Sequence, residues 1–362
     1  MQAEQPLAGI RVVEMASVGP VPFCAMMLEK LGAEVVIIDR PDRPDGRSTP
    51  KLDPLRCGRP SITLDLKAPS DKHKLLDLIR HADVLVEGMR PGIMEKLGLG
   101  PSVCLAANQR LVYSRISGWG PQGERAASAG HDINYLAASG GLWLIGEPDR
   151  PPVPPLNLVG DYGGGAMSLV SEILAALYVR ERTGSGRLVA TSILQGAVEL
   201  MGIFYARAVH ADGPARRGVD TLDGSAPHYR CYETADGKYV AIGAVEESFF
   251  LTLLATLGIA PDEFGDRRDM TNWPAQSERL AKVFKEHTRA EWTDRFATVD
   301  CCFSPVLDPN EALDELAKHA GDIYAGSQYS YEPATGPRAA GAPDRPSITL
   351  PDLLKEWSAP SA

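Results

Sequence analysis

The sequence predicts an α/β protein in which a large domain built on a parallel sheet is followed by a small α+β domain. Strand-like and helical runs alternate along the first half, and the opening run, 10–38, has the β-α-β order that crosses over into a parallel sheet. The linker-like segment 212–224 then precedes a pair of runs with a hairpin signal. A chain of 362 residues is also long enough for two domains.

Apolar runs bounded by turn residues predict the strands of the large domain. They are 10–14, 34–38, 61–65, 83–87, 111–115 and 188–191. Helices are expected at 23–31, at about 70–82 with Ser70 and Asp71 as its cap, at 94–96, at 132–138, at 166–183 and at 194–209. The last of these has a longer mixed apolar face than one small core needs, so we expect it to bridge domains or subunits.

The small domain is expected to start with a hairpin of strands 230–234 and 238–242, joined by Ala235-Asp-Gly237. Helices 248–257, 276–287 and 289–297 and the apolar run 302–307 complete it. The Pro- and Gly-rich tail from Ser327 is expected to be extended chain on the surface.

Composition and charge exclude several classes of protein. A net charge of -10 disfavours nucleic-acid binding, which requires a basic face. We find no apolar run long enough to span a bilayer and no signal peptide, so no membrane partner is expected. The six cysteines have no C-x-x-C spacing, which favours reduced thiols in the cytoplasm over a disulfide framework or a metal site.

Basic residues follow several predicted strands or begin the next turn. Because ligands of open parallel sheets collect at the carboxyl ends of the strands, these residues could form a cationic rim for phosphates. The alternative is scattered surface charge. The residues concerned are Arg40, Lys67, Arg90 and Lys96.

The acid Asp39 at the end of the second strand suggests a dinucleotide site, but the first turn, Ala16-Ser-Val-Gly-Pro20, lacks the G-x-G-x-x-G fingerprint. A nicotinamide enzyme therefore has little support. The chain also contains no G-x-S-x-G elbow, P-loop or H-E-x-x-H motif.

Two glycine-flanked blocks carry the ionisable residues best placed for chemistry. In the first, Gly130-His-Asp-Ile-Asn-Tyr135, His131 stands at the start of a short helix. The unpaired amides of that first turn, above all the Asp132 N–H, could hold an oxyanion. A structural histidine bonded to the sheet edge is the alternative.

The second block runs from Asn157 to Gly165 and contains Asp161. An N-cap aspartate before the following helix is the common explanation for such a residue. Three glycines in a row, 163–165, are more than a cap needs and suggest that a flat ligand lies against the backbone. We also expect a carboxylate near a helix N-terminus to ionise more easily, which suits a base.

Two further polar residues could support this pair. Glu246, at the end of a hairpin strand, could accept a hydrogen bond from the second nitrogen of His131 and fix its tautomer. Asn157 could do the same for Asp161. The alternative for Glu246 is an exposed surface carboxylate.

Several motifs occur together: 12–14, 38–41, 65–67, Gly130-His-Asp-Ile-Asn-Tyr-Leu-Ala137, 155–158 with Asp161 and 163–165, and 232–237 with 243–246. With them the chain resembles the α-methylacyl-CoA racemases of the class III CoA-transferase superfamily, over nearly its whole length. The resemblance implies a Rossmann-like large domain (1–191, completed by 322–362), a linker helix and loop (192–229) and a small domain (230–321). It also implies an interlocked homodimer with each active site between the large domain of one subunit and the small domain of the other.

The resemblance assigns roles to individual residues. The catalytic positions fall on His131, Asp161, Glu246 and Asn157. The coenzyme A contacts fall on Arg40, Leu64, Asp65, Leu66, Lys67, Gly88, Met89, Arg90, Lys96, Gly130, Asp132, Ile133, Asn134 and Tyr135. The match departs around 42–60, which concerns the adenine end of the site.

The implied activity is the interconversion of R and S 2-methylacyl-CoA thioesters by proton transfer on and off the α-carbon. Two acid/base groups of different type suit that chemistry, and no metal or redox cofactor is required. Three alternatives remain: a class III CoA-transferase with Asp161 as nucleophile, a CoA-binding protein without chemistry, and a nicotinamide dehydrogenase.

Overall fold

The computed structural model describes residues 5–41, 54–56, 58–210, 216–323 and 348–358, which form two compact units. The first unit comprises Met1–Gly141, Pro155–Tyr205 and His319–Ala362, and the second comprises Leu142–Pro154 and Ala206–Lys318. Residues 142–154 thus belong to the second unit, whereas the predicted boundaries place all of 1–191 in the large domain. The predicted segment 42–53 and the tail from 327 to 347 lie outside the described residues.

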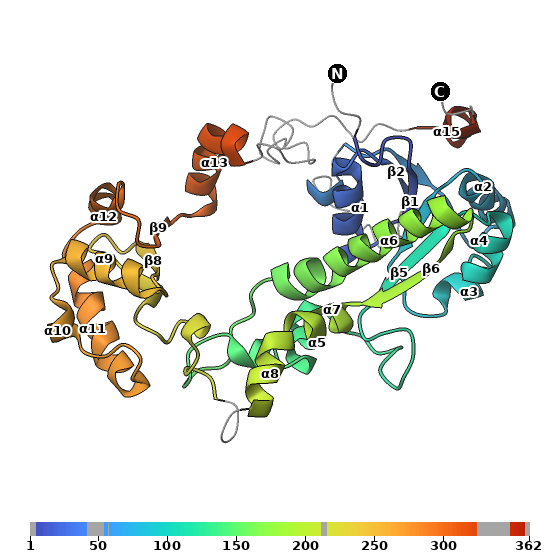
Figure 1. Cartoon of the computed structure of the whole chain (residues 1–362). Coiled ribbons are helices and arrows are strands. Elements are labelled where there is room, and N and C mark those ends of the chain that lie inside the picture. The colour runs from blue at the N-terminus through green and yellow to red at the C-terminus, as the bar shows by residue number, and fades with distance from the viewer. Residues whose placement is uncertain (1–4, 42–53, 57, 211–215, 324–347, 359–362) are drawn as a thin grey trace. The chain divides into compact units, whose positions relative to one another are not determined.

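A six-stranded parallel sheet forms the centre of the first unit (Figure 1). Its strands are β1 (Arg11–Met15), β2 (Glu34–Asp39), β3 (Ser61–Thr63), β4 (Val84–Glu87), β5 (Val112–Ser117) and β6 (Arg187–Ser192). Their order is β3-β2-β1-β4-β5-β6, with each neighbouring pair parallel. The predicted parallel sheet is confirmed, in the doubly wound order.

Alternate residues of the strands face two separate apolar cores, because strand side chains point to opposite faces. On one face Val12 and Val84 pack with α1 (Pro20–Lys30) and α6 (Met167–Thr183). On the other face Val13 and Leu85 pack with α2 (Pro69–Ile79), α4 (Pro101–Ala107) and α15 (Leu350–Ser358). The remaining helices in the described part of the first unit are α3 (Ile93–Lys96), α5 (Asp132–Ala138) and α7 (Ile193–Leu200); α8 (Gly202–His210) continues into the second unit.

Two predicted helix boundaries are wrong. Helix α2 starts at Pro69 without a side-chain cap, because proline suits the first helical turn and Asp71 lies inside that turn, where it accepts a hydrogen bond from the Asp65 N–H (2.9 Å). The helix predicted over 194–209 is two helices, α7 and α8, which meet at Met201 and Gly202. Glycine weakens a helix interior, so the break falls beside it.

The end of the predicted surface tail is also wrong. Helix α15 buries Leu350, Leu353 and Trp357 in the second of the two cores. The Arg11 side chain donates to the Trp357 carbonyl and lies over the indole ring, 5.8 Å from its centre. The last described residues therefore complete the sheet core instead of lying on its surface.

The segment before α6 is helical too. Residues Leu158–Ala166 form a π-helical segment, η3, which continues directly into α6. Together they make a helical stretch of 26 residues that is long and apolar enough to cross a membrane by length and composition. The expectation that no such stretch exists is therefore wrong, although Leu169, Ile173 and Leu177 of this stretch are buried against the sheet.

The second unit contains a three-stranded antiparallel sheet, β7 (Tyr229–Glu233), β8 (Tyr239–Gly243) and β9 (Phe303–Val306). The predicted hairpin is confirmed, with Glu233 opposite Tyr239. Its core includes Val240, Leu253 and Phe284. The helices are α9 (Glu247–Leu257), α10 (Pro261–Phe264), α11 (Trp273–Phe284), α12 (Arg289–Phe296) and α13 (Pro309–Ile323), the last of which runs into the first unit. Single 3₁₀ turns occur at Pro54–Arg56, Leu142–Leu144, Thr221–Asp223 and Met270–Asn272.

The glycines of η3 serve packing within the protein. A Cβ on Gly164 would lie 2.8 Å from the Gly196 carbonyl carbon of α7, and a Cβ on Gly196 would lie 2.3 Å from the Gly164 carbonyl carbon. A Cβ on Gly165 would meet Ile116 and Ile193 at 3.2 Å. Gly164 therefore lies against the backbone of α7, and Gly165 lies against the side chains of Ile116 and Ile193. For these two glycines the interpretation as a ligand surface is wrong.

This contact predicts the effect of Gly196→Ala. Alanine normally stabilises a helix interior by up to about 1 kcal/mol over glycine, but overpacking here outweighs that gain, and we expect a net loss of about 2–3 kcal/mol in the free energy of unfolding. Urea unfolding measures it. The matched control is Gly202→Ala, where a Cβ meets nothing within 4 Å, so stability should stay level or rise slightly. Equal stability of the two variants would contradict the close contact.

Candidate active site

The predicted site residues of the first unit gather at the carboxyl ends of the parallel strands. The order of the strands reverses between β1 and β4, and ligands of doubly wound sheets bind at that point. Gly88 follows β4, and a Cβ there would lie 2.8 Å from Val21 and 3.0 Å from the Ser17 hydroxyl. The loops after these two strands are therefore in direct contact.

Asp161 lies inside η3 and does not cap a helix, so the N-cap interpretation is wrong. The Asp161 N–H donates to the Asp132 carboxylate (2.6 Å), which is buried at the start of α5. The next ring, Tyr162, stacks on Phe23 of α1 with 4.5 Å between the ring centres. Isolated π-helical segments often occur at functional sites. Here the segment brings a carboxylate between the first turns of α1 and α5.

The Asp161 carboxylate lies against Gly19, the N-cap of α1. A Cβ on Gly19 would be 2.9 Å from Asp161 Oδ2, which is too close for any side chain. Gly19 also has φ +75°, a backbone conformation that favours glycine, so two separate reasons require glycine here. Dinucleotide enzymes of this fold hold a pyrophosphate at this helix N-terminus. A carboxylate in that place would repel a pyrophosphate, which weighs further against a nicotinamide enzyme.

Burial raises the pKa of Asp161 to about 6, and the negative charge of Asp132 acts in the same direction. A hydrogen bond from Asn157 and the positive charge of His131 oppose this rise in pKa. The expectation that the helix N-terminus favours ionisation of Asp161 is therefore wrong. Residues 20 and 22 of α1 are prolines without N–H groups, so the first turn offers few donors to a carboxylate.

His131 is the N-cap of α5, and the predicted helix at 132–138 is confirmed. Its backbone N–H donates to Asn134 Oδ1 (3.0 Å), while its side chain is exposed. His131 and Asn134 form a capping box, in which the His131 side chain faces the Asn134 N–H. Within the described ranges, no hydrogen bond involves the Asp132 N–H. The ring is thus accessible, and its charge reaches the Asp161 carboxyl.

Tyr135 completes the block as a packing residue. It is buried and meets the Trp119 ring edge-on, with 4.8 Å between the ring centres. A Cβ on Gly130 would lie 2.8 Å from its ring, so this glycine makes room for it. Burial raises the pKa of Tyr135, and the Asp161 carboxylate acts in the same direction while Arg90 opposes it. Tyr135, Asp161 and Arg90 therefore share one electrostatic environment.

The other positions of the predicted coenzyme A site follow β2, β3 and β4. Arg40, Asp65, Lys67, Arg90 and Lys96 are exposed. Leu64 and Leu66, by contrast, have their side chains in the apolar core and could offer a ligand only their backbone. Gly88, Met89, Ile133 and Asn134 are half-buried or exposed. No described contact joins Arg40 or Lys96 to Asp161.

Glu246 belongs to the second unit, where it is the exposed N-cap of α9. Its predicted hydrogen bond to His131 joins residues of different units and stays a prediction.

Glu87 is a functional candidate that sequence reasoning missed. It ends β4 with its side chain buried, and its Oε2 accepts a hydrogen bond from the Met89 N–H (2.7 Å). Burial raises the pKa of Glu87 to about 7. The sequence signal that could have identified Glu87 is an acidic residue at the end of an otherwise apolar strand. Its hydrogen bond holds the turn that carries Arg90.

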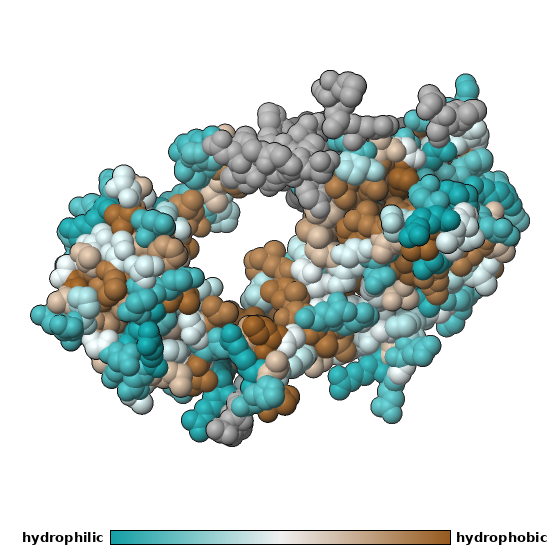
Figure 2. All heavy atoms as spheres, viewed as in Figure 1, coloured by the Kyte–Doolittle hydropathy of each residue, from teal (hydrophilic) through white to brown (hydrophobic). Residues whose placement is uncertain are grey.

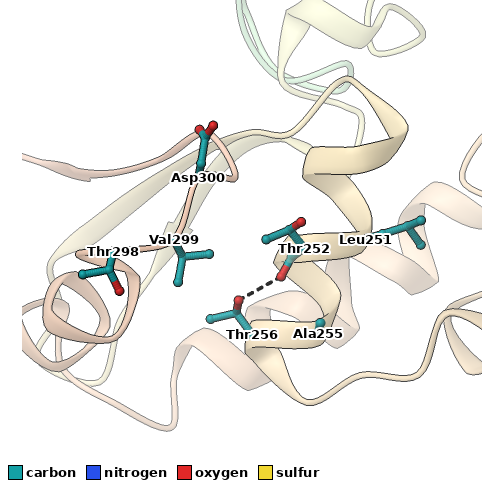
Figure 3. A pocket seen from close by; sticks show the side chains of 7 residues that line it. All are labelled: Leu251, Thr252, Ala255, Thr256, Thr298, Val299 and Asp300. Carbon is teal, nitrogen blue, oxygen red and sulfur yellow. Dashed lines mark hydrogen bonds between the residues drawn. The ribbon is translucent and has the colours of Figure 1, made fainter.

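Two hollows in the described parts of the chain contain none of these residues. One of about 790 Å³ lies in the second unit and is lined mainly by neutral side chains, such as Thr252 and Thr256 of α9 and Val299, with Asp300 at one edge (Figure 3). A smaller one of about 260 Å³ lies between α6 and α7 and reaches Gly163. No residue of the predicted site lines either hollow.

Metal ligands and disulfides are absent from the parts of the chain that the structure describes. No group of three or more His, Cys, Asp or Glu side chains is arranged there to hold a metal ion. The described cysteines are free thiols, with Cys24, Cys104 and Cys301 buried.

Known proteins resemble this chain over most of its length. A family model described as CoA-transferase family III matches residues 7–342. Human alpha-methylacyl-CoA racemase is 39% identical over 351 residues, which cover 97% of this chain and 91% of the human protein. The beta subunit of succinyl-CoA–L-malate CoA-transferase from Chloroflexus aurantiacus is 30% identical, over 88% of this chain and 80% of that protein. The crystal structure of a CAIB/BAIF family protein from Brucella suis is 24% identical with a TM-score of 0.75, over 87% and 88% of the two chains, which shows the same fold.

The raised pKa of Asp161 predicts a pH-dependent effect of Asp161→Asn on stability. The folded state holds the Asp161 proton more tightly than the unfolded chain does. The protonated Asp161 therefore makes its full contribution to the free energy of unfolding of the wild type below about pH 3.8, and this contribution is lost as the pH rises through about 6. Relative to wild type, the variant should gain about 1–2 kcal/mol between pH 4 and pH 7, a figure reduced for solvent screening. Urea unfolding at both values measures it, with Asp300→Asn as control. A variant that loses stability over this range would contradict the raised pKa.

Proposed function

The chain belongs to CoA-transferase family III, and on this premise we propose that it is a racemase that interconverts R and S 2-methylacyl-CoA thioesters. The observation that carries the proposal is the placement of His131 and Asp161 on two segments held together by the Asp132 hydrogen bond, with both side chains accessible. The 39% identity to human alpha-methylacyl-CoA racemase supports it.

Inversion at the α-carbon requires removal of a proton from one face and delivery of a proton to the other. A carboxyl group with a pKa of about 6 can accept and donate a proton near neutral pH, which suits Asp161 for either direction. His131 is the partner of different type. The two residues exchange the roles of base and acid when the reaction runs backwards.

The enolate formed between the two proton transfers needs hydrogen-bond donors at the thioester oxygen. The Asp132 N–H stands in the first turn of α5, where backbone donors have no partner within the helix. We assign it to the oxyanion. Asn157 supports Asp161 by a hydrogen bond, and Glu246 supports the second nitrogen of His131. A thioester acidifies its own α-proton, so these residues suffice without a resident cofactor.

Coenzyme A would bind along the carboxyl edge of the sheet. Arg40 and Lys67 follow the neighbouring strands β2 and β3 and supply positive charge for phosphates. Arg90 follows β4, on the other side of β1, and its charge acts on Tyr135 beside Asp161. The reacting carbon would then lie at the β1–β4 switch point, and the nucleotide would extend towards β3.

We further propose that the chain forms a homodimer that completes each site, with coenzyme A thioesters as its other partners in the cytoplasm. The apolar side chains of Leu158, Val198, Leu200 and Ile203 are 40–57% exposed on η3, α7 and α8. Hydrophobic residues are visible at the surface in this region (Figure 2). Exposed apolar side chains gathered on neighbouring elements support a protein interface here. A second subunit would also bring a small domain with Glu246 to His131.

A CoA-transferase is the alternative function. Above a pH of about 6 the half-buried Asp161 carboxylate is ionised and could attack the thioester carbonyl of an acyl-CoA, which breaks the C–S bond, forms a mixed anhydride and releases the coenzyme A thiolate. The 30% identity to a succinyl-CoA–L-malate CoA-transferase subunit supports this alternative. That mechanism gives His131 no role, so the histidine favours the racemase.

Isotope exchange distinguishes the two functions. In D₂O with one 2-methylacyl-CoA and no second acid, the protein should exchange the α-proton for deuterium, as followed by mass spectrometry. His131→Ala and Asp161→Asn should each lower the rate by about 100-fold or more, because each removes a proton-transfer group. Asp77→Asn, an exposed aspartate of α2, is the matched control and should exchange at the wild-type rate. A hydroxylamine-trapped acyl group on Asp161 without exchange would establish the transferase instead.

Subunit complementation tests the shared site. His131→Ala and Glu246→Gln chains carrying different tags are co-expressed, and the mixed dimer is purified. If each site uses two subunits, one of the two sites in this dimer is intact, so activity should return to about half of wild type. The control pair, His131→Ala with Asp161→Asn, leaves both sites defective. If activity does not return in the first pair, then His131 and Glu246 of each site belong to the same chain, or the protein is not a dimer.

A further inference from the structure

Glu246 lies in a short turn between β8 and α9. The backbone of this turn is constrained, since the Val245 N–H donates to the Gly243 carbonyl (2.8 Å) and the Phe250 N–H donates to the Glu246 carbonyl (3.0 Å). Within the described second unit, the Glu246 carboxylate has no hydrogen bond or ion pair of its own. Its direction therefore depends on how the turn is held.

One side chain, Arg267, holds this turn on both sides of Glu246. Its Nη1 donates to the Val245 carbonyl (2.8 Å) and, at 3.4 Å, to the Ala244 carbonyl. Its Nε and Nη2 donate to the Glu247 carboxylate at 3.2 and 3.0 Å. The Val245 carbonyl belongs to the peptide bond that leads into Glu246, and Glu247 is the next residue. The guanidinium therefore bridges the residues that flank Glu246.

Arg267 is itself fixed in place. Its side chain is only 12% exposed, and the guanidinium lies over the Phe250 ring, 4.8 Å from its centre. The Trp273 indole N–H donates to the Arg267 carbonyl (2.8 Å). With its backbone carbonyl hydrogen-bonded and its guanidinium stacked on a ring, Arg267 is expected to keep one rotamer.

The imidazole packed beside Arg267 carries no competing positive charge at neutral pH. His228 packs edge-on against Phe250 and Trp273, with 5.9 and 6.3 Å between the ring centres. Burial lowers the pKa of His228 to about 4, and the positive charge of Arg267 acts in the same direction. Arg268 also approaches Glu247, at 3.9 Å, but it is 80% exposed.

We propose that Arg267 is a positioning residue, which orients Glu246 towards the histidine of the active site by bridging Ala244, Val245 and Glu247. This inference rests on the proposed function, in which Glu246 supports His131. Lysine cannot replace this arginine, because a single ammonium cannot reach two backbone carbonyls and a carboxylate in the geometry of a planar guanidinium.

The test compares Arg267→Lys with Arg268→Lys in the α-proton exchange assay. Loss of orientation should lower kcat for Arg267→Lys by about tenfold, with KM nearly unchanged, since small misplacements of a supporting group are felt in the chemical step. Arg268→Lys should keep wild-type kinetics. If Arg267→Lys does not fold, Glu247→Gln, at a 55% exposed side chain, removes the carboxylate half of the bridge and should lower kcat about threefold.

A double-mutant cycle separates positioning from general damage. Arg267→Lys combined with Glu246→Gln should be no slower than Glu246→Gln alone, because the arginine acts through a group already removed. A further tenfold loss in the double variant would overturn the proposal. An unchanged rate in Arg267→Lys, or in Glu246→Gln, would overturn it too.

Amide hydrogen exchange of the segment 244–250 gives a readout that does not depend on the reaction. Exchange there should rise in Arg267→Lys and stay at the wild-type level in Arg268→Lys. If wild type lacks α-proton exchange, the proposed function fails, while a local rise in amide exchange would still support the bridge. Unchanged amide exchange in Arg267→Lys would overturn the positioning role whatever the activity.

Discussion

The hydrogen bond from the Asp161 N–H to the buried Asp132 carboxylate is the contact on which the candidate site depends. It joins residues 29 positions apart, and it fixes the π-helical turn against the first turn of α5. The same carboxylate has a second effect, because its negative charge adds to burial in raising the pKa of Asp161 to about 6. The buried Asp132 thus fixes the position of the half-buried Asp161 and, together with burial, raises the pKa at which Asp161 takes up a proton.

The doubly wound sheet is used here in an unusual way. The strand order is that of dinucleotide enzymes, yet the N-terminus of α1 has prolines at positions 20 and 22, and Gly19 makes room for the Asp161 carboxylate. A protein carboxylate occupies the place that such enzymes keep for a pyrophosphate. The switch point of the sheet therefore holds a carboxylate of the chain itself, and the proposed thioester would have to lie along the strand ends beside it.

Racemase and transferase chemistry can use the same aspartate, and its neighbours decide between them. A partly protonated carboxyl group beside an accessible imidazole suits proton transfer, whereas a nucleophile needs only ionisation and access. The second unit adds a comparable constraint, since Arg267 holds the residues on each side of Glu246. In both units a largely buried charged side chain, Asp132 or Arg267, holds the backbone beside a more accessible carboxylate, that of Asp161 or Glu246.

Local patterns were enough to predict the parallel sheet, the hairpin at β7–β8 and helix α5 with His131 at its start, because periodicity and turn residues act over a few positions. The motif Gly130-His-Asp-Ile-Asn-Tyr135 likewise indicated the family that residues 7–342 match. The tertiary structure decided what depends on distant neighbours. Gly164 meets Gly196, Trp357 enters the core, and burial beside Asp132 reverses the expected effect of the helix on Asp161. Close packing and desolvation arise only when remote segments meet, so no local pattern contains them.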